Sequence, residues 1–321
     1  MKKIAELISI PRDESEVCFE KKEHDFALFE IQGLRPTQED AAVAFWYPAG
    51  FFNTLSAQDI GHRLWTSYKL INQHCLKPGF GGSTASTTVY DGEGNLITAT
   101  LGDSVVFAVV YFPNGHVASV VRLNKIIHHP NLDQERLAKV RGLVRNGRLL
   151  GRNGSLALSR ALGDYDFIES GVCDDAHIDI TPSDFTHATG MKMQIITTCD
   201  GFTEPVPGQT KENQEQWFWK QLQSIDNPGT RSEAELARLL TYKALHAGSM
   251  DNISVSVQVL TKNKPFLVGI YDGHGGDSTS TYVASSMGKV FEQQCSLEAA
   301  AYAEQALSVE RNWAIYSRDN H

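Results

Sequence analysis

Short apolar runs separated by polar turns dominate the middle of the chain and predict β-strands. The run "SVVFAVVYFPNGHVASVV" is broken by Pro113, Asn114 and Gly115, so it predicts a hairpin of two strands. The run "TTVYDGEGNLITATLGDS" predicts a second hairpin that turns between Asp91 and Asn95. "DNISVSVQVL" and "PFLVGIYDG" are separated only by "TKNK", which predicts a third antiparallel hairpin.

Apolar residues at helical spacing predict helices between and after these strands. The stretch from Ile60 and the stretch after Asp277 each place apolar side chains on one face: Leu64, Tyr68 and Ile71 in the first, and Val283, Met287, Val290 and Phe291 in the second. A short helix is predicted from Asp133, a polar helical region over 203–248, and a final amphipathic helix from Ser296 to about Ala314. Hairpins with helices grouped between them indicate an α+β protein built on antiparallel sheets.

Nothing in the sequence divides the chain into separate units. It has 321 residues and 41% hydrophobic content, enough for a full core, and it contains no internal repeat, low-complexity segment or linker rich in Pro, Gly or Ser. We therefore interpret 1–321 as one domain, with an N-terminal extension or edge strand over 1–24, a core over 25–292 and a C-terminal helix over 293–321.

Charge and cysteine content exclude several classes of function. A formal net charge of −9 disfavours a phosphate-neutralising surface, so no nucleic-acid partner is expected. The 5 cysteines are odd in number and lack CxxC spacing, which argues against a disulfide framework and a zinc cluster. We interpret them as reduced thiols in a cytoplasmic protein.

The N-terminal sequence "MKKIAELISIPRDESE" does not fit a signal peptide, because Glu6 interrupts an apolar stretch that is already short. No segment is long and apolar enough to span a membrane, so no membrane partner is expected. Delivery by a specialised secretion system would leave no trace in these patterns and stays open.

Aspartate meets the end of an apolar strand five times along the chain, at Asp40, Asp103, Asp200, Asp251 and Asp272. One such case is ordinary, because aspartate favours turns. The third hairpin, however, would bring Asp251 and Asp272 to the same edge of a sheet. Gathered carboxylates favour hard cations such as Mg²⁺ or Mn²⁺, and a pair of these ions can activate water for attack on phosphorus. The pattern therefore predicts a two-metal phosphohydrolase.

Seven short motifs make the chain resemble the metal-dependent Ser/Thr protein phosphatases, the protein phosphatase 2C family. They are "GLRPTQEDAA", "GGSTAST", "LGDS", "NGSLALSRALGD", "TTCDGF", "GSMDNIS" and "YDGHGG". Each string is weak alone, but the seven together are specific, and they cover about residues 25–292. The resemblance implies a four-layer α-β-β-α sandwich of two stacked antiparallel sheets, and a phosphoserine/phosphothreonine protein phosphatase acting on phosphoproteins, which we expect to be a monomer.

One departure concerns the order of the motifs. In the family the DGHGG strand and its helix follow the RxxxED strand, whereas here DGHGG comes after "DNIS", near the end of the chain. The segment therefore looks transposed, as in a circular permutation. A strand can occupy the same place in a sheet whichever neighbour delivers it, so we expect the fold to survive.

The resemblance also implies roles for individual residues. The metal ligands it implies are Asp272, which bridges two ions, the Gly273 carbonyl, Asp200 and Asp251, Glu39 through water, and Asp103 with Asp200 at a third, weaker site. Arg35 resembles the arginine that binds the substrate phosphate, and His274 the proposed general acid. The implied mechanism is direct attack by activated water, without a phosphoenzyme.

Plainer explanations and other functions stay open. Arg35 could instead form a surface salt bridge with Glu39, and His274 could be an ordinary turn residue. Asp40 is interpreted as a structural support and Asp164 as a turn or network acid. Val105 replaces a family arginine in "GDSV", and "HHP" replaces the usual HKP, so a catalytically weak binding module is one alternative. A phosphatase of small phosphorylated metabolites is another.

The basic segment 132–155 corresponds in the resemblance to the family's flap beside the active site. Its arginines, Arg145, Arg148 and Arg152, could steer phosphopeptides towards the site. A solvated loop on an acidic protein explains the same charges.

Overall fold

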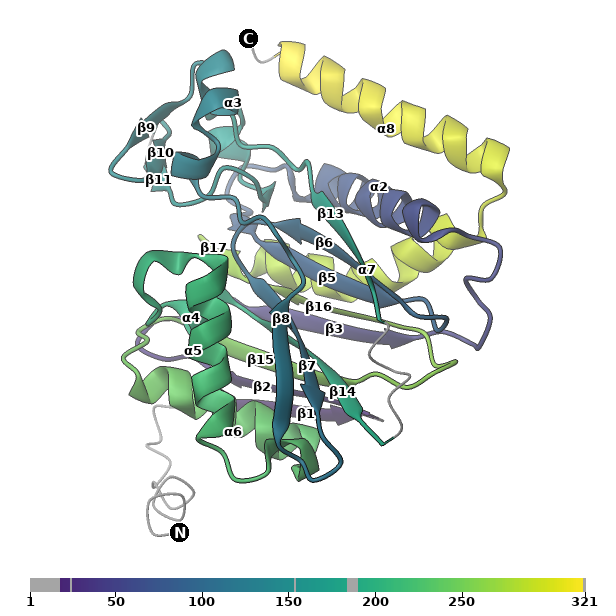
Figure 1. Cartoon of the computed structure of the whole chain (residues 1–321). Coiled ribbons are helices and arrows are strands. Elements are labelled where there is room, and N and C mark those ends of the chain that lie inside the picture. The colour runs from purple at the N-terminus through teal and green to yellow at the C-terminus, as the bar shows by residue number, and fades with distance from the viewer. Residues whose placement is uncertain (1–17, 24, 153, 184–189, 320–321) are drawn as a thin grey trace.

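Two antiparallel β-sheets face each other in the computed structural model, which describes residues 18–23, 25–152, 154–183 and 190–319 (Figure 1). The six-stranded sheet has the order β1 (Cys18–Glu23), β2 (Phe26–Ile31), β15 (Ile253–Val259), β14 (Lys192–Thr198), β7 (Val105–Tyr111), β8 (Val117–Arg122). The five-stranded sheet has the order β13 (His177–Pro182), β6 (Asn95–Leu101), β5 (Ala85–Tyr90), β16 (Phe266–Tyr271), β3 (Ala41–Trp46). The predicted hairpins β7–β8 and β5–β6 are confirmed.

The third predicted hairpin is wrong. β15 pairs with β2 and β14 in one sheet, whereas β16 pairs with β3 and β5 in the other. The "TKNK" connection therefore carries the chain from one sheet to the other. The physical reason is that both strands are buried along almost all of their length, because each lies in the interior of a sheet with a partner on both sides. The connection still reverses the chain, so the start of β15 and the end of β16 lie at the same end of the sandwich.

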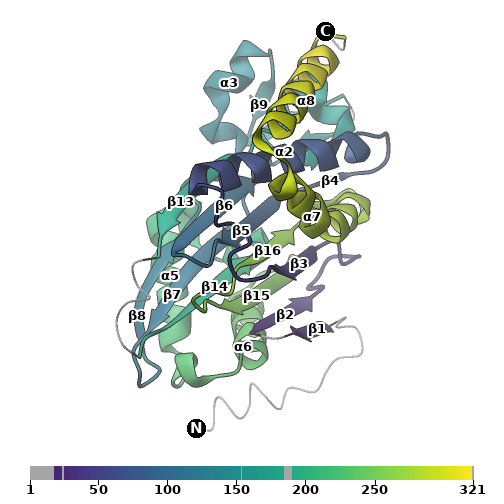
Figure 2. The same cartoon turned by 90° about the vertical axis from the view of Figure 1, so that its right-hand side faces the viewer.

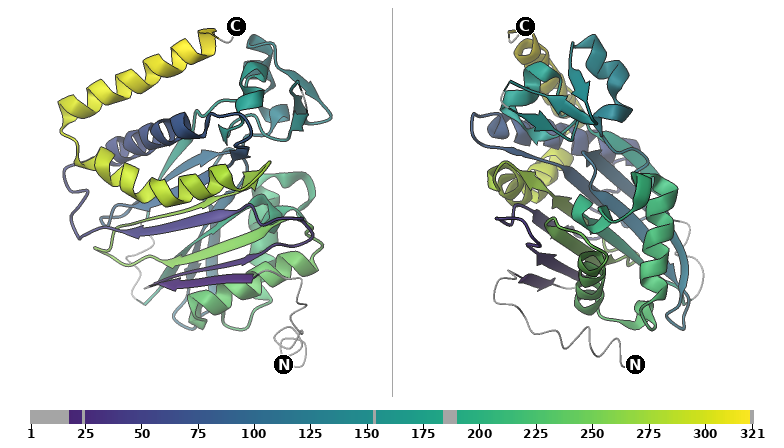
Figure 3. Two further views of the ribbon diagram at one scale, coloured as in Figure 1. Left: turned by 180° about the vertical axis from the view of Figure 1, so that it is seen from behind. Right: turned by 90° about the vertical axis from the view of Figure 1, so that its left-hand side faces the viewer.

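Helices cover the outer face of each sheet, as the two rotated views show (Figures 2 and 3). α2 (Ala57–Cys75) and α7 (Ser278–Ser296) pack on the five-stranded sheet, and α5 (Lys211–Gln223) and α6 (Glu233–His246) pack on the six-stranded sheet. The predicted α+β architecture of two antiparallel sheets flanked by helices is confirmed. Three short helical segments, α4 (Asp200–Thr203), η4 (Pro207–Gln209) and η5 (Pro228–Thr230), connect the strands and helices on the six-stranded side.

The core has three main layers of apolar side chains, and the alternation along each strand assigns residues to them. In β2, Phe26 and Leu28 point between the sheets, whereas Phe29 and Ile31 point towards α6. Burying each such side chain stabilises the fold by about 1.5–3 kcal/mol. Both faces of the inner strands are covered, so the polar residues that some of them carry, such as Ser254 and Ser256 in β15, are buried as well.

The C-terminal helix differs in its boundaries from the prediction. α7 continues through Ser296, and α8 spans Ala299–Asp319. The break comes at Leu297, whose backbone is extended. α8 lies outside α2 (Figure 1), where the hydroxyl of Tyr302 lies 2.8 Å from Thr66 Oγ1 and 2.7 Å from His62 Nδ1.

At the N-terminal end, β1 forms an edge of the six-stranded sheet. Residues 1–17 of the predicted extension lie outside the described residues. Among the described helices, none combines the length and the apolar character that crossing a bilayer requires.

The stretch between β8 and β13 projects from the sandwich as a small subdomain, here called the flap segment (residues 125–175; Figure 1). Its elements are η1 (Pro130–Leu132), α3 (Gln134–Lys139), β9 (Leu143–Arg145), β10 (Arg148–Leu150), β11 (Ser155–Leu156), β12 (Leu162–Gly163) and η2 (Tyr165–Ser170). It has an apolar core of its own, which includes Leu137, Leu149 and Val172.

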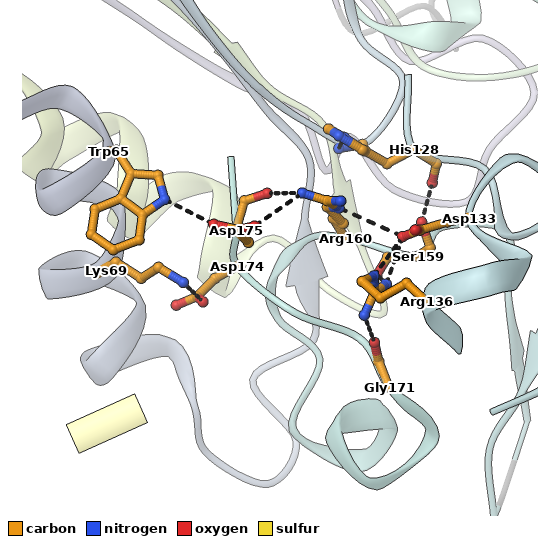
Figure 4. Close-up of polar contacts among 11 residues, drawn as sticks. Trp65, Lys69, His128, Asp133, Arg136, Ser159, Arg160, Gly171, Asp174 and Asp175 are labelled. Carbon is orange, nitrogen blue, oxygen red and sulfur yellow. Dashed lines mark hydrogen bonds and ion pairs between the residues drawn. The ribbon is translucent and has the colours of Figure 1, made fainter. Parts of the chain in front are cut away.

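An ion-pair network joins the flap segment to α2 (Figure 4). It consists of Lys69, Asp133, Arg136, Arg160, Asp174 and Asp175. Lys69 and Asp174 form its buried pair, with side chains 5% and 2% exposed. The indole of Trp65 donates a hydrogen bond to Asp175 Oδ1 at 3.0 Å.

Candidate active site

The aspartates predicted at strand ends do converge on one end of the sandwich. In the strand registers, Tyr271 lies opposite Ala41, and Thr198 lies opposite both Val105 and Val255. The ends of β16 and β14 and the starts of β3, β7 and β15 therefore lie together. We call the carboxylates gathered there the acid cluster: Glu39, Asp40, Asp103, Asp200, Asp251 and Asp272.

Asp272 and Asp200 lie at the centre of this cluster. The backbone N–H of Asp272 donates to Thr84 Oγ1 at 3.2 Å, which anchors the end of β16 beside β5. Burial raises the pKa of Asp272 well above its usual value, and the charges of Asp40 and Asp200 raise it further. Gly201, directly after Asp200, lies against the backbone of Asn252, so a Cβ there would come within 1.9 Å of that carbonyl oxygen. The glycine of "TTCDGF" therefore allows the ends of β14 and β15 to approach.

Asp251 faces the arginine of the RxxxED motif. Arg35 Nη2 forms an ion pair with Asp251 Oδ2, and 53% of the arginine side chain is exposed. The surface salt bridge between Arg35 and Glu39, the plainer explanation considered for the sequence, is not the pairing in the structure. Glu39 Oε1 instead accepts a hydrogen bond from Thr37 Oγ1 at 2.8 Å. Burial raises the pKa of Asp251, as does the charge of Asp200.

Asn252 ties the RxxxED loop to the start of β15. Its side-chain amide donates to the carbonyl oxygens of Gln32 at 2.7 Å and Thr37 at 2.9 Å, and its Oδ1 accepts from the N–H of Glu39 at 2.9 Å. This residue follows Asp251 in the "GSMDNIS" motif, but the sequence reasoning assigned it no role. It positions Glu39 and the loop that carries Arg35.

Asp103 is buried, and its carboxylate lies 3.6 Å from His129 Nδ1. Burial raises the pKa of Asp103 well above its usual value, with a further contribution from the charge of Asp200. His129 stands where the resemblance expected a lysine. Val105, the other departure from the family pattern, is a fully buried core residue at the start of β7.

Two acids were not predicted as site residues: Asp40 within the cluster, and Glu30 beside it in β2. Asp40 Oδ2 accepts a hydrogen bond from Ser254 Oγ at 2.6 Å, and Asp40 Oδ1 has no hydrogen-bond partner among the described residues. Burial raises the pKa of Asp40 to about 7. Burial and the charge of Asp40 raise the pKa of Glu30, in β2, to about 8. Asp40 therefore combines the supporting position expected for it with an unpaired oxygen that faces the cluster.

His274 contacts an acid that the sequence analysis kept apart from the site. Its Nε2 lies 2.8 Å from Asp164 Oδ2, at the base of the flap segment. Burial lowers the pKa of His274, but the charge and hydrogen bond of Asp164, with the charges of Glu39 and Asp200, outweigh it and leave the pKa raised. The "RALGD" motif contained the signal for Asp164, but no local pattern connects it to His274.

The donor set of the acid cluster fits hard divalent cations. Oxygen ligands suit Mg²⁺ and Mn²⁺, and buried carboxylates that repel one another gain most when a cation neutralises them. Ligand atoms of Asp40, Cys199 and Asp272 lie within 4.8 Å of one another. The thiol is an unsuitable ligand, because Cys199 Sγ already contacts the Asn252 carbonyl and the Ser254 N–H, and burial raises its pKa.

The comparisons with known proteins agree with this fold. The family model described as protein phosphatase 2C matches residues 51–253. That range is more than half of the chain, and Arg35, Glu39 and the DGHGG segment lie outside it. A comparison with curated proteins found no match.

Solved structures that resemble the chain include one with a TM-score above 0.5. Serine-threonine phosphatase 2C from Toxoplasma gondii is 16% identical, with a TM-score of 0.51, and the match covers 76% of this chain and 98% of that chain. A C. elegans sex determining protein is 18% identical, with a TM-score of 0.49, and the match covers 82% and 71%. The catalytic domain of the phosphatase PstP, in complex with 2 manganese ions, is 16% identical, with a TM-score of 0.41 and coverage of 74% and 98%.

Proposed function

The chain belongs to the protein phosphatase 2C family, and on this premise we propose that it is a metal-dependent phosphoserine/phosphothreonine protein phosphatase. The observation that carries the proposal is the acid cluster itself. Carboxylates from five separate segments meet at one end of the sandwich, and an exposed arginine lies beside them. Such a cluster would destabilise the fold unless cations offset its repulsion.

Residues of the acid cluster would hold two Mg²⁺ or Mn²⁺ ions. The proposed ligands are the carboxylates of Asp272, Asp200, Asp251 and Glu39 and the Gly273 carbonyl, with Asp103 and Asp200 at a third, weaker site. Such ions, when bound, would lower the pKa of water and offset the charge of a phosphoryl group. The hydrolysis would proceed without a phosphoenzyme.

Two cationic side chains would act on the substrate. The guanidinium of Arg35 is exposed, and its planar donors suit the phosphate oxygens of a phosphoserine or phosphothreonine. The imidazole of His274 would donate a proton to the departing serine or threonine oxygen. The substrates would be phosphoproteins, and the enzyme would act as a cytoplasmic monomer.

The transposed DGHGG segment would build this site from the C-terminal part of the chain. β16 lies between β3 and β5, and its last residue, Tyr271, is paired with Ala41 directly after the RxxxED motif. We propose that this is the place of the family's DGHGG strand, reached through the "TKNK" connection. The pairing supports the proposal because it brings Asp272 beside Glu39 and Asp40.

Hydrolysis of a phosphothreonine peptide tests the proposed function. Phosphate release is measured with Mg²⁺, with Mn²⁺ and with a chelator, for the wild type, Asp272→Ala and the control Asp277→Ala, an exposed acid at the start of α7 without a side-chain capping bond. We expect metal-dependent release that Asp272→Ala abolishes and Asp277→Ala preserves. Absence of release from a folded, metal-loaded protein would contradict the proposal and favour a binding module, and preferential turnover of sugar phosphates would favour a metabolite phosphatase.

A further inference from the structure

The pair formed by His274 and Asp164 points to a second functional acid outside the acid cluster. We propose that Asp164 is a positioning residue that fixes the tautomer and the orientation of the His274 imidazole during dephosphorylation. The inference rests on the proposed function, because it assigns a partner to the proton donor of that reaction. Asp164 itself is not one of the proposed metal ligands, since it belongs to the flap segment.

The geometry of the contact determines which ring nitrogen carries a proton. Asp164 Oδ2 lies 2.8 Å from His274 Nε2, and the side chains are 5% and 25% exposed. An ionised carboxylate only accepts hydrogen bonds, so Nε2 carries the hydrogen. The other ring nitrogen, Nδ1, has no hydrogen-bond partner among the described residues. It is therefore the nitrogen that can exchange a proton with a substrate.

A small three-stranded sheet holds the two side chains together. Its central strand β4 (Gly82–Ser83) pairs with β12, which precedes Asp164, and with β17 (Gly273–His274). The side chains of the pair lie over Gly82, where a Cβ would come within 2.3 Å of His274 Nε2 and 2.4 Å of Asp164 Cγ. Only glycine at this position leaves room for the contact.

The backbone at Asp164 is held from two further directions. Its N–H donates to the Gly81 carbonyl at 2.9 Å, and the preceding N–H, of Gly163, donates to Asn72 Oδ1 on α2 at 2.7 Å. Asp164 has φ 52° and ψ 43°, a left-handed conformation that asparagine also tolerates. Substitution by asparagine therefore preserves the turn while it replaces the carboxylate.

The proposed step moves one proton. The imidazolium of His274 gives the hydrogen on Nδ1 to the serine or threonine oxygen as its bond to phosphorus breaks. The neutral imidazole that remains carries its hydrogen on Nε2, and the Asp164 carboxylate accepts that hydrogen bond throughout. Without Asp164, the ring can rotate and the imidazolium loses the carboxylate that stabilises its charge, so fewer molecules present the Nδ1 hydrogen to the leaving oxygen.

The dependence on the leaving group tests this role. A threonine alkoxide needs a proton to depart, whereas p-nitrophenolate leaves readily without one. We expect Asp164→Asn and Asp164→Ala to lower kcat on a phosphothreonine peptide by about 10- to 100-fold, and kcat on p-nitrophenyl phosphate by less than about threefold. The matched control is Asp166→Asn, the same change at an exposed position two residues further on. Gly82→Ala keeps both residues but places a Cβ between their side chains, so it should reproduce the selective loss.

A double-mutant comparison separates positioning from a general structural role. If Asp164 acts through His274, adding Asp164→Asn to His274→Gln lowers kcat no further than His274→Gln alone. The proposal is overturned by an additional loss in the double variant, or by equal losses on the two substrates.

An NMR measurement is independent of turnover. At a pH high enough to deprotonate the imidazolium, the ¹⁵N shifts of the His274 ring in the metal-free protein should show the hydrogen on Nε2 in the wild type and in Asp166→Asn, and a mixture of tautomers in Asp164→Ala. Unchanged ring shifts in Asp164→Ala would contradict the proposal even if the protein proved to have no phosphatase activity. Absence of wild-type turnover with the expected ring shifts would instead count against the proposed function alone.

Discussion

The ion-pair network and the acid cluster both gather charged side chains in partly buried positions, but their charges balance differently. In the network, each aspartate faces a lysine or arginine, and the buried pair of Lys69 and Asp174 is completed by a hydrogen bond from Asn72 at 2.8 Å. In the acid cluster, Arg35 pairs with Asp251, while Asp272 lies among other carboxylates. Each charge of the ion-pair network therefore has a partner of opposite sign within the protein.

The ion-pair network has the charge balance of a structural element, and the acid cluster has that of a ligand-binding site. A buried charge is tolerated when it is paired and hydrogen-bonded, and it is costly otherwise. The pKa values of Asp103, Asp251 and Asp272 are all raised, and burial is the largest cause in each case. The cluster therefore gains from cations or protons, whereas the network needs neither.

The largest expected effect comes from removing a carboxylate at the centre of the cluster. Asp272→Asn should reduce metal-dependent phosphate release by at least about 10³-fold, because it removes the proposed bridging ligand. The same variant should be as stable as the wild type or more stable without metal, since it removes one repelling charge. Turnover and chemical denaturation with a chelator measure the two effects. If Asp272→Asn lost stability but kept activity, Asp272 would be a structural residue and not a metal ligand.

In the ion-pair network, Lys69→Met should lower stability and leave turnover almost unchanged. It leaves Asp174 buried without its cation, so we expect the free energy of unfolding to fall by about 3 kcal/mol. The turnover of the folded fraction should stay within about twofold of wild type, because Lys69 has no role in the proposed chemistry. Urea denaturation and active-site-normalised kinetics test this, with the exposed Lys139→Met as control. Unchanged stability would show that the buried pair of Lys69 and Asp174 does not stabilise the fold.

The pH dependence of stability should distinguish Glu30, beside the acid cluster, from ordinary surface acids. Because the pKa of Glu30 is raised to about 8, the metal-free folded state binds its proton more tightly than the unfolded state does. That stabilisation is lost as the pH rises towards 8. Glu30→Gln should therefore gain stability relative to wild type by about 1–3 kcal/mol between pH 5 and pH 8. Denaturation of both proteins in chelator at the two pH values measures the gain, and a constant difference would contradict the raised pKa.

The smallest effect is expected at the surface of the flap segment. Arg152 and Glu169 form an ion pair with side chains 78% and 44% exposed. Arg152→Gln should therefore change stability by less than about 0.5 kcal/mol. If this arginine steers phosphopeptides, the variant should lower kcat/KM slightly at low salt and leave it unchanged at high salt. The absence of any salt-dependent difference would identify the charge as that of a solvated loop.

Much of the architecture follows from local patterns. The hairpins β5–β6 and β7–β8 were predictable because each turn lies between its two strands, and α2 and α7 because their apolar residues repeat at helical spacing. The hairpin predicted around "TKNK" was wrong for a physical reason. A short turn shows that the chain reverses direction, but both strands are buried and each can pair on either edge, so turn length alone does not identify the partner.

The sequence by itself determined the type of chemistry: aspartates at strand ends, in an acidic chain, with the motifs of a phosphatase family. The tertiary structure alone decided which of those groups meet. The contacts of Arg35 with Asp251 and of Asp164 with His274 join segments that are far apart in the chain, and no local periodicity encodes such contacts. They depend on the packing of the two sheets and on the close approach of backbone segments that glycines allow. Both arise only when the chain folds.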